Sequence, residues 1–556
     1  METRFHLRDI PEWAKSMTFS EKICAARGLE KDKIEQFLNP ILIRKKIHPK
    51  DEFPAIEEAA EFLTNALKKK KKILIWGDYD TDGIMASAIL SDLFKDRVEY
   101  AVHIPERQDG YGLKMDKLIE VCKDFKPDML VTVDCGITAC EEIAWAKKNG
   151  IATLVTDHHI SGKEIPNADA LCDPILGNSG KYKYLCGAGV AWLLANLVQD
   201  RINDAIQKNR NEWILYAGIA TVADIVPLYE NEELPWNVNR FIVRKALDEL
   251  KKITRKPSRH FGLSKLLTIN DSNPRFVPSS YISFVIAPCI NAAGRMTSPL
   301  HAYKMITEKS VEEAEYCIQQ NGIRKHMEAE KVVELLEKIP YERSVLFDTI
   351  NIGLLGLLAG RITERRAKPT ILLTEINDRY QGSGRAPDGY DLYDLLSQCS
   401  DLLIGFGGHQ KAAGCMIEKN NLEAFRQKFS DLVDAVPTSD YCDIYMDMEL
   451  TGKDINFDNL NDLHRMEPMS QAGNPEPLFY MKNCKIDNLT LRGVNSQHLL
   501  FRVETSNGDF FGKKWNAREE YSLLKRNPVQ NIAFKMTDPY FGYKPEIEVL
   551  AFLGNT

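Results

Sequence analysis

Short runs of consecutive apolar residues alternate with longer amphipathic segments through the first third of the chain. The runs Ile73-Leu-Ile-Trp76, Met129-Leu-Val-Thr-Val133 and Ala152-Thr-Leu-Val-Thr156 have the length and composition of strands that are buried on both faces. The segments 54–72 and 140–149 carry apolar residues at helical spacing instead. Strands separated by helices predict a parallel sheet with crossover helices, in which ligands bind beyond the carboxyl ends of the strands.

The pattern changes twice further along the chain. A long helical stretch at 311–338 leads to a second α/β region that begins near Arg343. The elements expected there are a strand at 370–373, a glycine-rich turn at 381–385, a helix from Leu392 and a second glycine-rich segment at 405–414. From Tyr441 onwards short runs such as 499–503 and 547–552 alternate apolar and polar residues, which predicts a small all-β module.

The composition is that of a globular protein with several domains. A length of 556 residues predicts three or four domains, and 44% hydrophobic with 27% charged residues are ordinary values for packed cores. The 72 Lys and Arg residues against 79 Asp and Glu residues give a net charge of −7. A polyanion would therefore have to bind a local basic patch.

Composition also argues against a membrane and against an oxidising compartment. The longest apolar stretch, 352–359, is far shorter than the roughly 20 residues that span a bilayer, and the charged N-terminus lacks the apolar core of a signal peptide. The twelve cysteines form no Cys-x-x-Cys pair, and Cys135 and Cys140, the nearest to a ligand spacing, are expected in the core. We therefore expect a cytoplasmic protein without zinc fingers and without membrane contact.

Three carboxylates stand on alternate positions directly after the first predicted strand. They are Asp78, Asp80 and Asp82, in Gly77-Asp-Tyr-Asp-Thr-Asp-Gly83. Carboxylates this close repel one another unless a cation neutralises them, and hard cations such as Mg²⁺ or Mn²⁺ prefer oxygen ligands. The pattern alone is equally typical of a solvated acidic loop with Asp82 as a helix cap, and the later ligands of a calcium-binding loop are absent.

The next two predicted strands end in residues of the same kind. Asp134 follows the second strand, and Asp157-His158-His159, which holds the only adjacent histidine pair of the chain, follows the third. Asp224 lies in an otherwise apolar run, where a buried acid needs a partner. Oxygen and nitrogen ligands from four segments suit two metal ions that share a carboxylate, the arrangement used for in-line attack on phosphorus.

These four segments resemble the four motifs of the DHH phosphoesterases. The motifs are, in chain order, Gly-Asp-Tyr-Asp-Thr-Asp-Gly, Val-Asp-Cys-Gly, Thr-Asp-His-His and Val-Ala-Asp-Ile-Val-Pro-Leu. Further segments resemble the RecJ branch of single-strand-specific exonucleases: Ile104-Pro-Glu-Arg107 with Gly110-Tyr-Gly112, Cys186-Gly-Ala-Gly-Val-Ala191, Asn291-Ala-Ala-Gly-Arg-Met296, Gly407-Gly-His-Gln-Lys-Ala-Ala-Gly414 and Gly473-Asn-Pro-Glu-Pro477.

The resemblance covers about residues 50 to 556 and implies a domain order. After a polar N-terminal segment, the expected parts are a parallel-sheet DHH domain, a connecting helix, a smaller α/β DHHA1 domain and an all-β barrel of the oligonucleotide-binding (OB) type. Their expected limits are 1–50, 51–310, 311–342, 343–440 and 441–556.

The resemblance also implies a role for each matching residue. Two Mn²⁺ or Mg²⁺ ions are expected on Asp80, Asp82, Asp134, His158 and Asp224, with Asp78 just outside the ligand set. His159 is expected to face the scissile phosphate, and Asp157 to orient the histidines through hydrogen bonds. Phosphate binding needs donors that an acidic cluster lacks, and these are expected from Arg107, Arg295, Ser383, Arg385 and His409.

One position departs from the family pattern. Members of the RecJ branch usually carry Trp-His just before the Gly-x-x-Gly at 353–356, where this chain has Ile350-Asn351. Asn351 can replace only the hydrogen bonding of that histidine. Two basic segments, 68–72 and 240–259, are more typical of solvated faces than of DNA contacts.

The function implied by the resemblance is a metal-dependent exonuclease that degrades single-stranded DNA from 5′ to 3′ and releases mononucleotides, in DNA repair or recombination. The alternatives are a phosphodiesterase for short RNA or cyclic dinucleotides, a manganese pyrophosphatase, and a non-catalytic replication or repair scaffold. The extra β module favours a polymer, because such barrels offer aromatic platforms along a basic groove. Expected partners are single-stranded DNA and a helicase or a single-strand-binding protein, and we expect a monomer.

Overall fold

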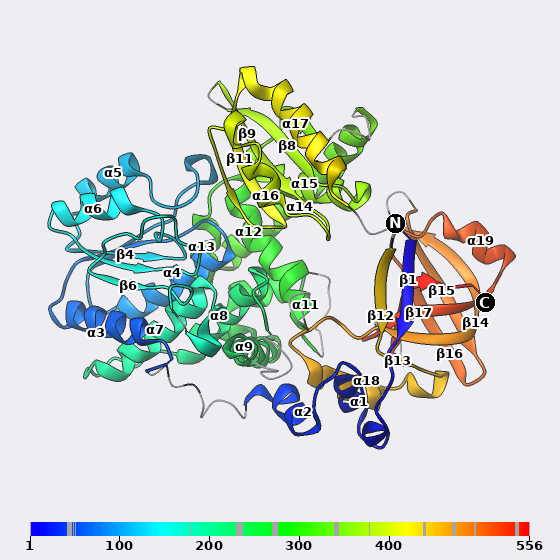
Figure 1. Cartoon of the computed structure of the whole chain (residues 1–556). Helices are drawn as coiled ribbons and strands as arrows, with labels where there is room; N and C mark the ends of the chain where they lie inside the picture. Colours follow the sequence, from blue (N-terminus) through cyan, green and yellow to red (C-terminus); the bar gives the residue numbers. More distant parts are fainter. Residues whose placement is uncertain are drawn as a thin grey trace.

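Three bodies make up the computed structural model of the chain (Figure 1): an α/β domain, a smaller α/β domain and a β-barrel. The described residues are 2–41, 47, 49–50, 52–177, 179–228, 237–269, 276–338, 344–376, 378–437, 441–469, 474–493, 496–539 and 544–554. Arg343, where the second α/β region was expected to begin, and Gly473 of the last motif lie outside these ranges.

The first domain is built on a parallel sheet, as predicted, and its five strands lie in the order β3-β2-β4-β5-β6. Its strands are β2 (Ile73–Trp76), β3 (Tyr100–His103), β4 (Met129–Val133), β5 (Ala152–Thr156) and β6 (Ala170–Cys172). Side chains alternate between two cores, because Ile73 and Ile75 belong to one and Leu74 and Trp76 to the other.

Helices cover both faces of this sheet. The core that contains Ile73 and Ile75 is completed by α3 (Pro54–Lys68), α4 (Thr81–Phe94) and α7 (Gly187–Arg201), and the opposite core by α5 (Met115–Phe125) and α6 (Cys140–Lys148). The first core extends into α8 (Arg210–Ala223), α9 (Val238–Arg255), α10 (Phe261–Leu267), α12 (Ala287–Met296) and α13 (Leu300–Thr307). The long helix α14 (Val311–Lys338) then leads to the second domain.

The second domain has a mixed sheet in the order β10-β11-β9-β8-β7. Its elements are β7 (Val345–Phe347), α15 (Leu355–Arg366), β8 (Thr370–Ile376), β9 (Arg379–Arg385), α16 (Leu392–Ser397), β10 (Gly405–Gly408), β11 (Ala412–Glu418) and α17 (Leu422–Ala435). The prediction of a glycine-rich turn at 381–385 is wrong, because these residues form part of strand β9. A Cβ on Gly382 would stand 2.5 Å from Leu373, so the glycine makes room for a neighbouring strand's side chain.

The C-terminal module is a closed barrel, as predicted. Its strands are β13 (Met448–Glu449), β14 (Phe479–Arg492), β15 (His498–Thr505), β16 (Gly508–Lys514), β17 (Val529–Thr537) and β18 (Glu546–Phe552), with α19 (Glu520–Arg526) after β16. The order is β13-β14-β15-β16-β18-β17, and pairing of β14 with β17 closes the ring.

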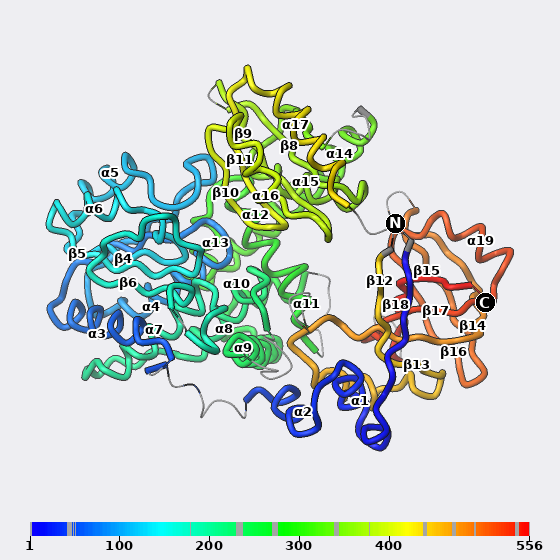
Figure 2. The backbone as a smooth tube through the Cα atoms, viewed as in Figure 1, coloured from blue at the N-terminus to red at the C-terminus, as the bar shows by residue number. Residues whose placement is uncertain are grey.

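The N-terminal residues pack against the barrel instead of forming a separate polar segment. Strand β1 (Glu2–Leu7) pairs in parallel with β12 (Tyr441–Met446), and the N-terminus lies beside the barrel in Figure 2. Helices α1 (Phe19–Ala26) and α2 (Lys31–Leu38) share the barrel's core through Ile23 and Phe37. These helices are short and amphipathic, so their average composition hides the few apolar residues that pack.

Arg240 of α9 joins the barrel module to the first domain. Its side chain is 0% exposed and donates to the backbone carbonyls of Phe37, Met466 and Pro468 at 2.8–2.9 Å, with its guanidinium 3.9 Å from the centre of the Phe37 ring. A DNA contact by this residue is therefore excluded. The lysine run at 68–72 precedes β2 and so lies at the amino end of the parallel sheet, opposite the acidic strand ends.

None of the helices in the described ranges combines the length and the apolar character that a membrane crossing needs. The twelve cysteines are all free thiols. Cys135 is buried as expected, whereas the expectation that Cys140 lies in the core is wrong, because its side chain at the start of α6 is only half-buried.

Candidate active site

The acidic turn after β2 is folded around the start of α4. Asp80 caps this helix, because its Oδ1 accepts hydrogen bonds from the backbone N–H of Asp82 at 2.9 Å and of Gly83 at 3.2 Å. A Cβ on Gly83 would lie 2.5 Å from the backbone of Asp78, so only glycine allows the turn to close this tightly. The motif thus brings three carboxylates to one helix N-terminus.

Asp82 is held by a second helix N-terminus. Its two carboxylate oxygens accept hydrogen bonds from the backbone N–H of Gly187 at 2.7 Å and of Ala188 at 2.6 Å, at the start of α7. Burial and the neighbouring Asp80 nevertheless raise the pKa of Asp82 to about 6. The segment that begins at Cys186 therefore fixes this carboxylate in place.

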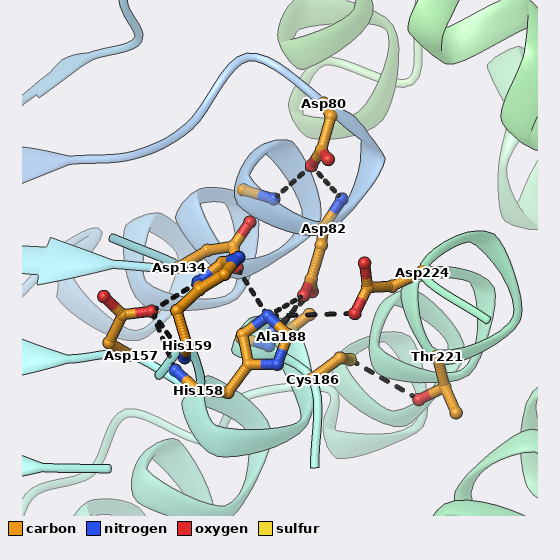
Figure 3. A network of polar contacts seen from close by, with 12 residues as sticks. Asp80, Asp82, Asp134, Asp157, His158, His159, Cys186, Ala188, Thr221 and Asp224 are labelled. Carbon is orange, nitrogen blue, oxygen red and sulfur yellow. Dashed lines mark hydrogen bonds and ion pairs between the residues drawn. The ribbon is translucent and has the colours of Figure 1, made fainter. Parts of the chain in front are cut away.

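His158 lies among three carboxylates (Figure 3). Its Nε2 is 3.0 Å from Oδ1 of Asp134, 3.5 Å from Oδ2 of Asp82 and 3.7 Å from Oδ2 of Asp224. Asp134 follows β4 with a φ of +60°, and Asp224 follows the last residue of α8. Strand ends and one helix end thus converge on a single point.

Side chains that could hold a metal ion form three overlapping groups. In each group the ligand atoms lie within 4.8 Å of one another. The first group is Asp82, His158 and Asp224, and the second is Asp78, Asp80 and Asp134. The third is Asp134, His158 and His159. Asp78 was expected outside the ligand set, yet its carboxylate forms one of these groups with Asp80 and Asp134. We call Asp78, Asp80, Asp82, Asp134, His158 and Asp224 the acid centre.

The electrostatics of the acid centre suit divalent cations. Oδ1 of Asp134 and Nε2 of His158 are buried, and their contact with each other at 3.0 Å is not a hydrogen bond, so neither atom has a hydrogen-bond partner among the described residues. Burial and the charges of Asp82 and Asp80 raise the pKa of Asp134 well above its usual value, whereas burial and His159 lower the pKa of His158 to about 3. A neutral imidazole and crowded carboxylates offer lone pairs that a hard cation would satisfy.

Asp157 orients both histidines and is absent from the three ligand groups. It accepts hydrogen bonds from the backbone N–H of His158 at 2.8 Å and of Ile137 at 2.9 Å, and its Oδ1 lies 2.8 Å from Nδ1 of His159. Burial would lower the pKa of His159, but the hydrogen bond and charge of Asp157 raise it to about 9. The contact with Asp157 therefore favours the protonated form of His159.

Two residues of this region have no role in the sequence-based prediction. The hydroxyl of Tyr111 donates to the backbone carbonyl of Asp134 at 3.0 Å and lies 3.0 Å from Nδ1 of His159. Asp173, 2% exposed, follows the short strand β6, and burial and Asp157 raise its pKa to about 6. Tyr111 stands between the glycines of a quoted motif, which was a usable signal, whereas a strand of three residues gives too little pattern to reveal Asp173.

The expected phosphate-binding residues gather around the start of α15. The guanidinium of Arg295 donates to the carbonyl of Gly353 at 2.9 Å, and Arg385 donates to Oγ of Ser383 at 3.3 Å. A Cβ on Gly356 would lie 2.8 Å from Nη2 of Arg385, so this glycine admits the arginine. We call Arg107, Arg295, Ser383 and Arg385 the arginine pocket.

The arginine pocket adjoins the acid centre. Burial and the nearby Arg107 and Arg324 lower the pKa of Arg295 to about 9, although the negative charge of Asp80 acts to raise it. Arg107 lies 4.2 Å over the ring of Tyr79, next to Asp80, and its Nε has no hydrogen-bond partner among the described residues. An unpaired guanidinium donor beside carboxylates that could hold a cation fits a bound phosphate.

A cavity of about 1190 Å³ lies next to the arginine pocket. Arg295 and Arg385 line it, together with Asn291, whose Oδ1 accepts a hydrogen bond from the backbone N–H of Thr81 in the acidic turn at 2.9 Å. Residues of both α/β domains and of the barrel module form its wall. The cavity is therefore the common space of all three bodies.

His409 and Asn351 complete the comparison with the sequence. His409 follows β10, where its backbone N–H donates to the carbonyl of Ala412 at 2.7 Å, and it lies near enough to His158 to help lower the pKa of that histidine. Oδ1 of Asn351 accepts a hydrogen bond from the backbone N–H of Gly353 at 2.8 Å. Asn351 thus holds the loop to which Arg295 also binds.

Three family models match the chain in the order expected. They are the "DHH family, N-terminal domain" at residues 72–219, the "DHHA1 domain" at 343–435 and the "RecJ OB domain" at 446–550.

Relatives and solved structures agree with the family models. The single-stranded-DNA-specific exonuclease RecJ of Salmonella typhimurium is 29% identical over 535 residues, which cover 90% of this chain and 88% of that protein. The RecJ of Bacillus subtilis is 27% identical over 492 residues, and the match covers 84% of this chain and only 60% of that protein. The crystal structure of RecJ with Mn²⁺ from Thermus thermophilus superimposes with a TM-score of 0.79 at 25% identity, covering 100% of this chain and 80% of that one.

Proposed function

Since this chain belongs to the RecJ branch of the DHH phosphoesterase family, we propose that it is a metal-dependent exonuclease that degrades single-stranded DNA from the 5′ end and releases mononucleotides. The relatives that carry the name RecJ are single-stranded-DNA-specific exonucleases. We propose that the enzyme acts in DNA repair or recombination and is located in the cytoplasm.

Two divalent cations, Mn²⁺ or Mg²⁺, would be held by the acid centre. Asp82, His158 and Asp224 offer one set of ligand atoms and Asp78, Asp80 and Asp134 the other. When bound, the cations would polarise a water molecule and the scissile phosphate, and would neutralise the charge that develops during attack. Asp134, which also belongs to a group with His158, is the carboxylate best placed to serve both ions.

His159 would act on the phosphate as a proton donor. Its Nδ1 is tied to Asp157, so Nε2 is the free nitrogen of the ring. The raised pKa favours the protonated ring, whose Nε2–H would donate to a phosphate oxygen. Asp157 and Tyr111 would hold the ring at a fixed angle.

The arginine pocket would bind the 5′-terminal phosphate. Arg295, Arg385 and Ser383 supply convergent donors, and Arg107 adds an unpaired N–H on the side of the acid centre. A terminal phosphate carries more negative charge than an internal diester, so a pocket of this kind favours the end of the strand.

Arg295 and Arg385 line one cavity together with residues of the barrel module, and Asn291 on its wall bonds to the acidic turn; this observation carries the proposal. The test is cleavage of single strands labelled at the 3′ or the 5′ end, with a matched duplex as control, in Mn²⁺ and in EDTA. Mononucleotides released from the 5′ end of the single strand in Mn²⁺ alone are expected. Internal fragments, or equal cleavage of the duplex, would contradict it.

We also propose the domain limits 51–310, 311–342, 343–440 and 441–556, with residues 1–50 mainly part of the barrel module. The chain would act as a monomer on strands supplied by a helicase or a single-strand-binding protein. Sedimentation of the free protein and of its DNA complex tests the monomer.

A further inference from the structure

Three large apolar side chains are more exposed than any others in the described ranges. Phe284 is 71% exposed, Ile160 61% and Ile225 60%, the highest values among the large hydrophobic residues in the described ranges. Ile160 directly follows His159, and Ile225 directly follows Asp224. Single exposed apolar residues are ordinary, but Phe284 and Ile225 line the same cavity, and such a pair points to a ligand with apolar surface.

The backbone pushes Phe284 outward. Residues Ile282–Ile286 form a π-helical turn between α11 (Ser279–Tyr281) and α12, with a hydrogen bond from the N–H of Ala287 to the carbonyl of Ile282. Pro288 accounts for this turn, because it has no N–H for the carbonyl of Phe284 four residues earlier and its ring displaces that carbonyl. The widened turn leaves Phe284 at the cavity wall.

Ile225 reaches the same wall through a conformation that its side chain disfavours. Its φ is +57°, in the left-handed region where a β-branched residue is an outlier. Such residues cluster at binding and active sites, where the surrounding structure holds them. Since α8 packs against the π-helical turn, Ile225 and Phe284 lie on adjoining elements and line one cavity.

We propose that Phe284 and Ile225 form a platform on which nucleobases of the DNA strand stack beside the scissile phosphate. This inference rests on the proposed function and extends it to the substrate's bases. The same cavity carries Arg295 and Arg385, so phosphates have cationic partners and bases have apolar ones within one space. Bases in a duplex are stacked and paired, so only a single strand can present their faces to this platform.

Binding of a 5′-phosphorylated ten-nucleotide strand, measured by fluorescence anisotropy in EDTA, tests the platform. A strand of the same length with abasic sites after the first nucleotide provides the comparison. For Phe284→Ala we expect affinity for the ordinary strand to fall about 5- to 100-fold, and affinity for the abasic strand to stay that of the parent. Phe284→Tyr, which keeps an aromatic ring, should restore binding.

Phe261→Ala is the matched control, because Phe261 on α10 is 50% exposed and is not among the residues that line the cavity. It should bind both strands as the parent does. An unchanged affinity of Phe284→Ala for the ordinary strand, or an equal loss for both strands, overturns the platform. If the parent itself neither binds nor, in Mn²⁺, degrades the ordinary strand, the proposed function fails and the platform with it.

Discussion

Gly187 lies so close to Asp134 that a Cβ on Gly187 would stand 2.5 Å from the Cβ of Asp134. Its backbone N–H also donates to Asp82 at 2.7 Å, so one residue touches two proposed metal ligands. We expect Gly187→Ala to displace Asp134 and to lower kcat/KM on single-stranded DNA about 100-fold or more, since misplacement by about 1 Å has that effect. Steady-state kinetics in Mn²⁺ measure it.

Gly322→Ala in α14 is the control, because a Cβ there meets no atom within 4 Å. This change should leave the rate unaltered and stabilise the helix by up to about 1 kcal/mol. A Gly187→Ala variant with the parent's rate would show that the contact between Gly187 and Asp134 is not needed.

The strand ends were predictable from sequence because buried parallel strands leave a simple apolar pattern, and Asp134 and His158 follow such runs directly. The structure brings them within 3.0 Å of each other, as expected. The features that the sequence pattern could not predict depend on contacts between residues far apart in the chain. Gly382 serves a neighbouring side chain instead of a turn, and Ile23 belongs to a core completed more than four hundred residues later, by strands such as β14.

Arg385 should determine the preference for a phosphorylated end. The parent is expected to degrade a 5′-phosphorylated strand faster than its 5′-hydroxyl counterpart, and Arg385→Ala should remove most of that difference by deleting a charged donor. Initial rates on the two strands, labelled at the 3′ end, measure this. Arg379→Ala, at the exposed opposite end of β9, should keep the parent's preference. A parent without any preference would disprove the assignment of the pocket.

Arg240 should contribute strongly to stability. Arg240→Ala leaves three backbone carbonyls, those of Phe37, Met466 and Pro468, buried without their donor. The free energy of unfolding is expected to fall by about 3 kcal/mol or more, measured by denaturant unfolding. The exposed Lys251 on the same helix offers the control, since Lys251→Ala should change stability by less than about 0.5 kcal/mol. Equal effects of the two substitutions would refute the role of Arg240.

His260 should make stability depend on pH. Its side chain is 1% exposed, its Nδ1 accepts the backbone N–H of Leu263 at 3.1 Å, and burial together with Lys309 lowers its pKa from 6.5 to about 3. Between these values the unfolded chain binds a proton that the folded chain excludes, so stability is lost as the pH falls below 6.5.

In His260→Asn the asparagine side chain can still cap the N-terminus of α10, but it does not titrate in this pH range. From pH 7 to pH 5 the variant should lose about 2 kcal/mol less unfolding free energy than the parent. His326→Asn, on an exposed face of α14, should lose as much as the parent. Parallel pH profiles for His260→Asn and the parent would contradict the neutral, buried imidazole.

Calorimetric titration of the protein with Mn²⁺ tests the two-cation acid centre most directly. The parent should bind two ions, and Asp224→Asn should lose one, because Asp224 belongs to a single ligand group. Asp134→Asn should lose both, since Asp134 is shared between groups, and asparagine tolerates its φ of +60° without disturbing the fold. Two ions bound with unchanged affinity by Asp134→Asn, or no Mn²⁺ bound by the parent, would contradict the account.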